Sequence, residues 1–263
     1  MTTPNYPPPN AGSPPKLIIF DFDGTLFDFD GTLFDTHTSI THYISLTFSH
    51  LLPSSQPPTL PSTRATISSG AGLEPTFRTL LLHVPTQNNP TDINNLDLAN
   101  WITTYRTLYA SEGQSLIKPF AKVDCILREL KAIGIPVVVI SNKGKEAVEQ
   151  VLEKEGLAKL VALVVGDTPG VPKKPDPASF RDLVSPLYPD IKAKDILVVG
   201  DTEADILFAK NIGAHSCWAS YGYGEPEKCE NLAYDVKINE LSNRLPSFQS
   251  VYSISSKGLL NKL

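Results

Sequence analysis

The stretch KLIIFDFDGTLFDFDGTLFDT, Lys16 to Thr36, decides the fold. Four apolar residues, Leu17 to Phe20, run without alternation into Asp21, and a turn signal follows at Asp23-Gly24-Thr25. A short continuous apolar run that ends in a glycine-containing turn is typical of a strand buried on both faces. Open α/β sheets bind their ligands at the carboxyl ends of such strands. Asp21 and Asp23 are therefore candidate functional residues.

The two carboxylates of this segment lie only two residues apart. Both would point toward the ligand crevice if the strand ends in a turn between them. Two carboxylates this close do not both stay ionised unless a cation lies nearby. The pair therefore predicts either a bound metal ion or a carboxyl group that carries a proton.

A tandem repeat makes this segment unusual, because DFDGTLF occurs at residues 21–27 and again at 28–34. The working pair is therefore either Asp21 with Asp23, or Asp28 with Asp30. We favour the first pair because LIIF precedes it directly. Use of the second pair would place Asp21 and Asp23 inside a buried strand, where an uncompensated charge costs several kcal/mol. The other seven residues would enlarge a surface loop, which costs little.

Composition indicates a globular chain. With 263 residues and 41% hydrophobic content, it can bury one large domain or two smaller ones. The net charge of −5 gives no reason to expect a nucleic-acid partner, since such proteins carry basic patches. No apolar run reaches the length that spans a bilayer, so no membrane partner is expected.

Cysteine usage and the N-terminus concern the compartment. The three cysteines are widely spaced and match no metal-ligand pattern, so we expect reduced thiols at Cys125, Cys217 and Cys229. The N-terminus lacks the layout of a signal peptide. We expect a soluble cytoplasmic protein. The C-terminal Asn261-Lys262-Leu263 matches a peroxisomal Ser-Lys-Leu address in two of three positions, which leaves a small peroxisomal pool as an alternative.

The chain divides by composition into tails, a helical insertion and an alternating α/β region. Residues 1–15 are rich in proline and predict a disordered tail, as do residues 247–263 at the other end. Residues 36–117 contain seven charged residues and no lysine, with apolar residues at helical spacing between proline-rich breaks at 53–61 and 85–90. This pattern predicts a small α-helical cap domain inserted after the first strand.

The remainder, residues 118–246, alternates strands with helices. The expected helices are 123–132, 145–155 and 205–212, and the expected strands are 136–140, 161–165, 195–199 and 215–219. Repeated βα units predict an α/β fold, a Rossmann-like parallel sheet with helices on both faces. The core domain would comprise residues 16–35 and 118–246.

Polar residues also follow the strands after the first one, which is Leu17 to Phe20. Ser141-Asn142 follow the second strand, Lys173 to Pro177 the third, and Gly200 to Asp205 the fourth. Carboxylates suit Mg²⁺, which prefers oxygen ligands and usually also binds a substrate phosphate. A hydroxyl, a lysine and loop amides suit phosphate oxygens. An aspartate can itself act as the nucleophile toward phosphorus.

In this order, these segments resemble the haloacid dehalogenase-like hydrolase superfamily, and within it the phosphoglycolate phosphatase group with a helical cap. DFDGTL, VVVISNK, KKPDPASF and VVGDTEADILFAKNIGA match its four motifs, and SYGYG at Ser220 to Gly224 adds to the resemblance. The resemblance spans Lys16 to Leu245. The motifs are specific for the superfamily and much less so for the substrate.

The resemblance implies a role for each motif residue. Asp21 would be the nucleophile, and Asp23 would protonate the leaving oxygen and then activate water. The residues that would hold the phosphoryl oxygens are Gly24, Thr25, Ser141, Asn142 and Lys174. Of these, Lys174 would also be a catalytic residue. The ligands and orienting groups of Mg²⁺ would be Asp21, Asp23, Asp201 and Asp205. Asp23 also argues against the dehalogenases of the superfamily, whose first motif lacks this carboxylate.

The cap is expected to select the substrate, because closing a lid places specificity groups over the reacting phosphate. Its candidate residues are Gly70, in the loop Ser68 to Gly72, and the two flanking arginines, Arg64 and Arg78. One of these arginines would bind a substrate carboxylate. Phosphonoacetaldehyde hydrolases of the superfamily need a cap lysine, which residues 36–117 lack.

The resemblance implies a Mg²⁺-dependent phosphatase that acts on a small phosphorylated metabolite such as phosphoglycolate, through an aspartyl-phosphate. The enzyme alternatives are a sugar phosphomutase, a nucleotidase or a pyrophosphatase of the same superfamily. A non-enzymatic relative is a further alternative, since the repeat lengthens the segment between the catalytic turn and the cap. The oligomeric state, monomer or homodimer, is left open.

Overall fold

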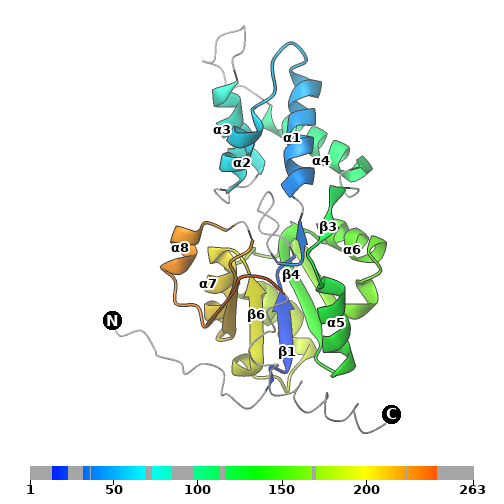
Figure 1. Cartoon of the computed structure of the whole chain (residues 1–263), viewed down its shortest axis with the longest axis vertical. Coiled ribbons are helices and arrows are strands. Elements are labelled where there is room, and N and C mark those ends of the chain that lie inside the picture. Colours follow the sequence, from blue (N-terminus) through cyan, green and yellow to red (C-terminus); the bar gives the residue numbers. More distant parts are fainter. Residues whose placement is uncertain are drawn as a thin grey trace.

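The structure is a computed structural model of the whole chain (Figure 1). It describes residues 14–22, 32–35, 37–68, 73–84, 97–112, 116–167, 170–222 and 224–241. The two predicted tails therefore lie outside the described residues, except for Pro14 and Pro15. So does the C-terminal tripeptide on which the peroxisomal alternative rests.

Six of the described strands form one parallel sheet, in the order β5-β4-β1-β6-β7-β8. Their bounds are β1 Leu17–Phe20, β4 Val137–Gly144, β5 Leu163–Asp167, β6 Ile196–Gly200, β7 His215–Ala219 and β8 Val236–Ile238. β1 lies inside the sheet between β4 and β6, pairing Ile18 with Val137 and Leu197. The predicted Rossmann-like α/β fold is confirmed.

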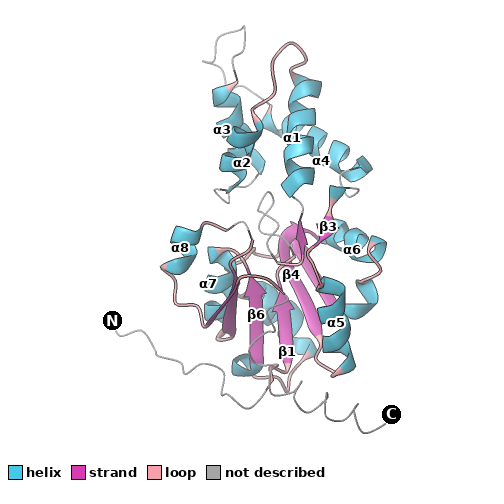
Figure 2. Ribbon diagram, in the orientation of Figure 1, coloured by secondary structure: helices cyan, strands magenta, loops and turns pink. Residues whose placement is uncertain are grey.

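Both faces of the sheet are covered, as Figure 2 shows. Ile18 and Phe20 of β1 pack in one hydrophobic cluster, which includes side chains of α5 Val123–Ala132 and α6 Lys145–Lys154. Leu17 and Ile19 pack in a second cluster, with side chains of α7 Glu203–Ile212. Alternate residues of a strand point to opposite faces, so an uninterrupted apolar run is what a strand between two helical layers requires.

In the part of the chain that the structure describes, four helices lie beyond the carboxyl ends of the strands, at the top of Figure 1. They are α1 His37–Leu51, α2 Leu60–Ser68, α3 Leu73–His83 and α4 Leu98–Glu112. Aromatic rings hold them together, with the centroid of Trp101 at 4.7 Å from Phe48 and 5.5 Å from Phe77. These helices occupy the insertion predicted at 36–117, and the domain boundaries themselves remain a prediction.

Two short strands connect the helices to the sheet. β2 (Phe34–Asp35) pairs antiparallel with β3 (Lys118–Pro119), and the amide of Phe120 donates to the carbonyl of Leu33 at 2.9 Å. The ring of Phe34 lies 4.7 Å from that of Phe22. Phe22 belongs to the first copy of the repeat and Phe34 to the second. The first copy therefore continues the central strand, while the second leads into the helices.

Several helices and strands have other bounds than the sequence predicted, or were not predicted at all. The predicted break at 53–61 overlaps the start of α2, because Pro61 lies in the first helical turn, where its missing N–H is not needed. The third strand begins two residues later than predicted. The remaining elements are α8 Pro226–Glu230 and β8, with a π-helix at Ser179–Val184 and 3-10 turns at Ala158–Leu160, Ser185–Leu187 and Ala193–Asp195.

Among the described helices, none has both the length and the apolar character that crossing a bilayer requires.

Candidate active site

The carboxyl end of β1 places Asp21 at the centre of the sheet edge. Its backbone amide donates to the carbonyl of Val199 on β6 at 2.8 Å, which continues the parallel ladder by one residue. The residue is 1% exposed. The ladder and the buried Phe22 that follows hold this carboxylate in place.

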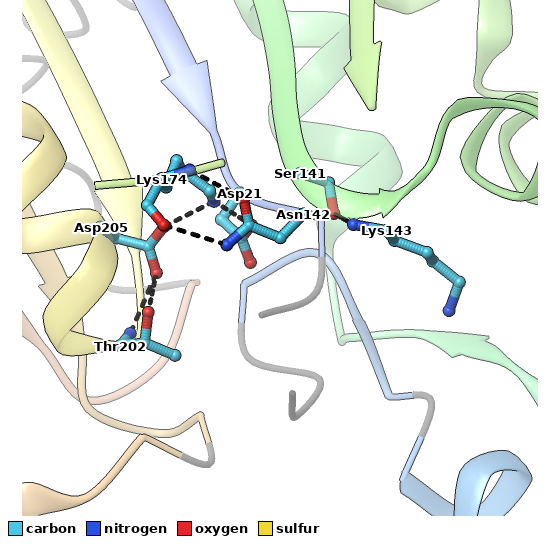
Figure 3. Close-up of polar contacts among 7 residues, drawn as sticks. All are labelled: Asp21, Ser141, Asn142, Lys143, Lys174, Thr202 and Asp205. Carbon is cyan, nitrogen blue, oxygen red and sulfur yellow. Dashed lines mark hydrogen bonds and ion pairs between the residues drawn. The ribbon is translucent and has the colours of Figure 1, made fainter. Parts of the chain in front are cut away.

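Lys174 joins two of the predicted site carboxylates (Figure 3). Its ammonium donates to Oδ1 of Asp21 and, at 2.6 Å, to Oδ1 of Asp205. All three side chains are about 2% exposed or less. Burial alone would lower the pKa of Lys174, but the negative charges of Asp205 and Asp21 outweigh it, and the pKa is raised above its ordinary value. Lys174 is therefore a permanent cation in the site.

Asn142 holds the backbone of Lys174. Oδ1 of Asn142 accepts from the Lys174 amide at 2.9 Å, and its Nδ2 donates to the Lys174 carbonyl at 3.3 Å. Both ends of the side-chain amide thus bind one residue, Lys174, which precedes the cis peptide bond to Pro175. Asn142 positions the lysine in this structure, and its predicted contact with phosphate remains a prediction.

Asp205 is oriented by the start of α7. Oδ2 of Asp205 accepts from the backbone amide of Thr202 at 3.0 Å and from its hydroxyl at 2.7 Å. This is a capping box, in which residues three apart satisfy the free amides of a helix start. A Cβ on Gly200 would lie 2.3 Å from the Asp205 side chain, so glycine is required for this close approach. With Oδ2 held, Oδ1 faces Lys174.

Asp201 is fully buried between β6 and the glycine-rich loop after β7. The indole of Trp218 donates to its carbonyl at 3.0 Å, and the amide of Gly224 donates to its Oδ2 at 3.2 Å. A Cβ on Gly222 would lie 2.3 Å from the Asp201 side chain. The SYGYG run therefore supplies the space and an amide that hold this carboxylate.

The donor set fits a divalent cation. Asp21, Asp201 and Asp205 each offer a carboxylate oxygen, and these oxygens lie within 4.8 Å of one another. Among the described residues, the three buried carboxylates and the Lys174 ammonium give this cluster a formal charge of −2. An uncompensated buried charge is strongly unfavourable, and a divalent cation would neutralise it. Oxygen-only donors favour Mg²⁺ over softer metals.

Ser141 lies in the same strand extension as Asn142. It is 4% exposed, and its hydroxyl oxygen accepts from the backbone amide of Lys143 at 3.0 Å. β4 is irregular between Ile140 and Gly144, which turns these residues out of the regular ladder. Figure 3 draws Ser141 on the far side of Asn142 from Asp21, and its predicted role in binding phosphate remains a prediction.

Other predicted residues are placed elsewhere or not described. Asp23, Gly24, Thr25, Asp28, Asp30 and Gly70 lie outside the described residues. Arg64 is exposed on α2. Arg78 on α3 forms an i,i+4 ion pair with Glu74 at 3.0 Å, an ordinary helix-surface pair. The roles given to both arginines remain predictions.

Sequence reasoning gave no role to Thr202, Trp218, Gly222 or Gly224. One signal was present, because a threonine three residues before an acid at a helix start is a capping-box spacing. The SYGYG run added to the family resemblance, but nothing in it indicated what its two glycines contact. Their role depends on a carboxylate that lies 21 and 23 residues earlier in the chain.

Comparisons with known proteins agree with the fold and the motifs. The family model described as haloacid dehalogenase-like hydrolase matches residues 25–219. The chain is 36% identical over 125 residues to a phosphoglycolate phosphatase of Vibrio parahaemolyticus and 32% identical over 137 residues to one of Vibrio cholerae. The matched segments cover 47% and 52% of this chain, and 54% and 60% of the length of these relatives.

Solved structures share the fold at low sequence identity. A haloacid dehalogenase-like family protein of Streptococcus pneumoniae superposes with a TM-score of 0.70 at 20% identity, covering 89% of this chain and 98% of its own. A predicted phosphoglycolate phosphatase of Haemophilus somnus gives 0.68 at 20% identity, covering 91% and 97%.

The start of the family match bears on the repeat. It begins at Thr25, so the whole second copy lies inside it and Asp21 lies before it. An alignment that uses the second copy needs no seven-residue insertion. The structure, by contrast, places Asp21 of the first copy beside Lys174 and Asp205. We follow the structural placement, and a pair of variants described below separates the two.

Proposed function

The chain belongs to the haloacid dehalogenase-like hydrolase family, and from this we propose that it is a phosphatase of small phosphorylated metabolites, with phosphoglycolate as first candidate substrate. The observation that carries the proposal is the buried contact of Lys174 with Asp21 and Asp205. That contact brings together residues from the segments that follow three strands, β1, β5 and β6. The described helices above this edge, α1 to α4, would belong to the cap, residues 36–117, that encloses the substrate.

Asp21 would perform the first step. A carboxylate oxygen of Asp21 bonds to phosphorus as the bond to the leaving oxygen breaks, which yields an aspartyl-phosphate. The leaving oxygen takes a proton from the carboxyl group of Asp23, a role that rests on the resemblance alone. Water then attacks phosphorus, gives its proton to Asp23, and releases inorganic phosphate and Asp21.

Positioning and charge neutralisation dominate such a transfer, because its transition state is loose and metaphosphate-like. Lys174 would hold a phosphoryl oxygen and keep Asp21 aligned. Ser141 would bind a second oxygen. Asp21, Asp201 and Asp205 would hold Mg²⁺, which supplies further neutralisation of the phosphoryl charge when bound.

Substrate selection would come from the cap. Arg64 and Arg78 are the candidates for a second anionic group, such as the carboxylate of phosphoglycolate. For Arg78 this requires exchange of its surface pair with Glu74, which contributes little since both side chains are largely exposed.

A direct assay tests the proposal. Purified full-length chain is incubated with phosphoglycolate, and separately with an aryl phosphate, in Mg²⁺ and after chelation with EDTA. We expect phosphate release that depends on Mg²⁺ and favours phosphoglycolate. Folded protein that binds Mg²⁺ but releases no phosphate from either compound or from a wider panel of phosphorylated metabolites would instead indicate a non-enzymatic relative.

A further inference from the structure

Lys143 connects two parts of the molecule that the mechanism above does not link. It follows Ser141-Asn142 in β4, and its backbone amide donates to the Ser141 hydroxyl at 3.0 Å. Its side chain extends away from the carboxylate cluster, as Figure 3 shows. The ammonium donates to the hydroxyl of Tyr109 at 3.1 Å. Tyr109 lies on α4, in the helical layer above the sheet.

The contact is more than one hydrogen bond. The Lys143 ammonium lies 5.1 Å from the centroid of the Tyr109 ring, within the range of a cation–π interaction. Tyr109 is 9% exposed. Its ring stacks on Tyr105 at 5.5 Å and meets the edge of Tyr43 at 5.6 Å. The phenol is therefore fixed by α1 and α4, and it presents a fixed target to the lysine.

We propose that Lys143 and Tyr109 form a bridge that sets the position of the helical layer relative to the phosphate-binding residue Ser141, and that Lys143 is a positioning residue for turnover. This inference rests on the proposed function for its kinetic consequence.

Two features of the fold support the bridge. First, α1 to α4 pack chiefly against one another, and the chain reaches them through the short strands β2 and β3. A layer connected by such a narrow link needs side-chain contacts to fix its orientation. Second, one residue contacts both sides, through its backbone to Ser141 and through its side chain to α4. A shift of α4 is therefore transmitted to the residue beside the Ser141 hydroxyl.

The kinetic test uses the full chain with Mg²⁺ and phosphoglycolate. Lys143→Met removes the charge and should lower kcat/KM about tenfold, which corresponds to about 1.4 kcal/mol of transition-state stabilisation. Tyr109→Phe removes only the hydroxyl and should lower it about threefold. The double variant should match Lys143→Met, since the hydroxyl has no ammonium left to bind. Lys143→Arg should recover most of the loss, because a guanidinium also donates and stacks on aromatic rings.

Lys145→Met is the matched control. Lys145 lies two residues away, is largely exposed and pairs with Glu149 at 3.6 Å on its own helix. Its removal should change kcat/KM by less than about twofold. Additive losses in the double variant, or an equal loss in Lys145→Met, would overturn the bridge.

A second readout is independent of turnover. Hydrogen exchange of the amides in α4 and in residues 116–120 should be faster in Lys143→Met and Tyr109→Phe than in the parent. Lys145→Met should exchange as the parent does. If the parent has no phosphatase activity but shows this exchange pattern, the proposed function fails while the bridge holds. Unchanged exchange in both bridge variants overturns the bridge.

Discussion

The ammonium nitrogen of Lys174 lies 2.6 Å from Oδ1 of Asp205, and both side chains are 2% exposed. The two residues are 31 positions apart in the chain. Asp205 belongs to the first turn of α7, while Lys174 belongs to a loop that Asn142 anchors. A buried ion pair is weak evidence of stability by itself, but removal of one partner leaves a buried charge uncompensated. This pair therefore gives a sensitive probe of the site.

Lys174→Met should destabilise the protein by about 3–5 kcal/mol in the absence of metal, because it removes the ammonium that pairs with the buried carboxylates of Asp21 and Asp205. Mg²⁺ should raise the Tm of the variant more than that of the parent, because a cluster of higher negative charge binds a cation more tightly and binding stabilises the folded state. Thermal unfolding with and without MgCl₂ measures both effects.

Lys173→Met is the control for this variant. Lys173 pairs with Asp167 at 3.1 Å in a partly exposed position. Exposed pairs contribute about 1 kcal/mol or less. A similar loss of stability in both variants would contradict the assignment of Lys174 to the cation cluster.

Asp21→Asn should abolish turnover, with a fall in kcat of at least about 1,000-fold, as expected when a nucleophile is removed. Asp28→Asn should retain activity within a few-fold of the parent. Intact-mass analysis after rapid quenching should find a phosphorylated protein in the parent and not in Asp21→Asn. If Asp28→Asn is the inactive variant, the second copy of the repeat carries the nucleophile. That result would agree with the family match, which begins at Thr25 and includes only the second copy in full.

Gly222→Ala should weaken Mg²⁺ binding, because the added Cβ would meet Cβ of Asp201 at 2.3 Å and move the carboxylate. We expect the Mg²⁺-dependent rise in Tm to shrink markedly. Gly144→Ala is matched to it, since a Cβ there meets nothing within 4 Å and the φ of −54° suits any residue. An equal response to Mg²⁺ in the two variants would show that Gly222 does not position Asp201.

Much of the fold followed from the sequence because several strands of the sheet are continuous apolar runs, such as Leu17–Phe20, and glycines end helices such as the one before Gly213. The helix at 123–132 and the strand at 215–219 were predicted with the bounds that the structure has. The short strands β2 and β3 were not, since two residues each give no period to detect. Their pairing depends on residues more than 80 positions apart.

The site was predictable in its residue types more than in their contacts. Asp21, Lys174, Asp201 and Asp205 each follow a strand, so their meeting at one edge follows from the parallel topology. That Asn142 holds the lysine backbone, or that Lys143 turns toward Tyr109, depends on side-chain directions in an irregular strand end. Sequence spacing alone does not specify such directions.

Thiol reactivity should separate the three cysteines. Cys125 is exposed on α5, whereas Cys217 and Cys229 are buried, and burial raises the pKa of each buried thiol to about 12. An aromatic disulfide reagent at pH 8 should therefore label one thiol in the native protein and three after denaturation. Hydrogen bonding to Asp124, together with its charge, raises the pKa of Cys125, so its labelling should speed up as the pH rises. Labelling that persists in native Cys125→Ser would show that a buried site opens.

Deletion of residues 28–34 should give a folded protein with at least the parental kcat/KM. The deletion restores a single DFDGTLF motif between the central strand and the helices. Shortening a loop by seven residues changes its closure entropy by less than about 1 kcal/mol. Circular dichroism and the phosphoglycolate assay measure the outcome, and an insoluble or inactive product would show that the extra residues are structural.

Parts of both copies of the repeat contribute to the fold, and this affects which seven residues can be called the insertion. Phe22 of the first copy meets Phe34 of the second, so each copy keeps one part of the motif in the fold. Because the repeat is perfect, removal of any seven consecutive residues between Asp21 and Asp35 produces one and the same chain. The sequence alone therefore does not specify which seven residues were inserted. Only the three-dimensional structure distinguishes residues that belong to the family's framework from residues that are surplus to it.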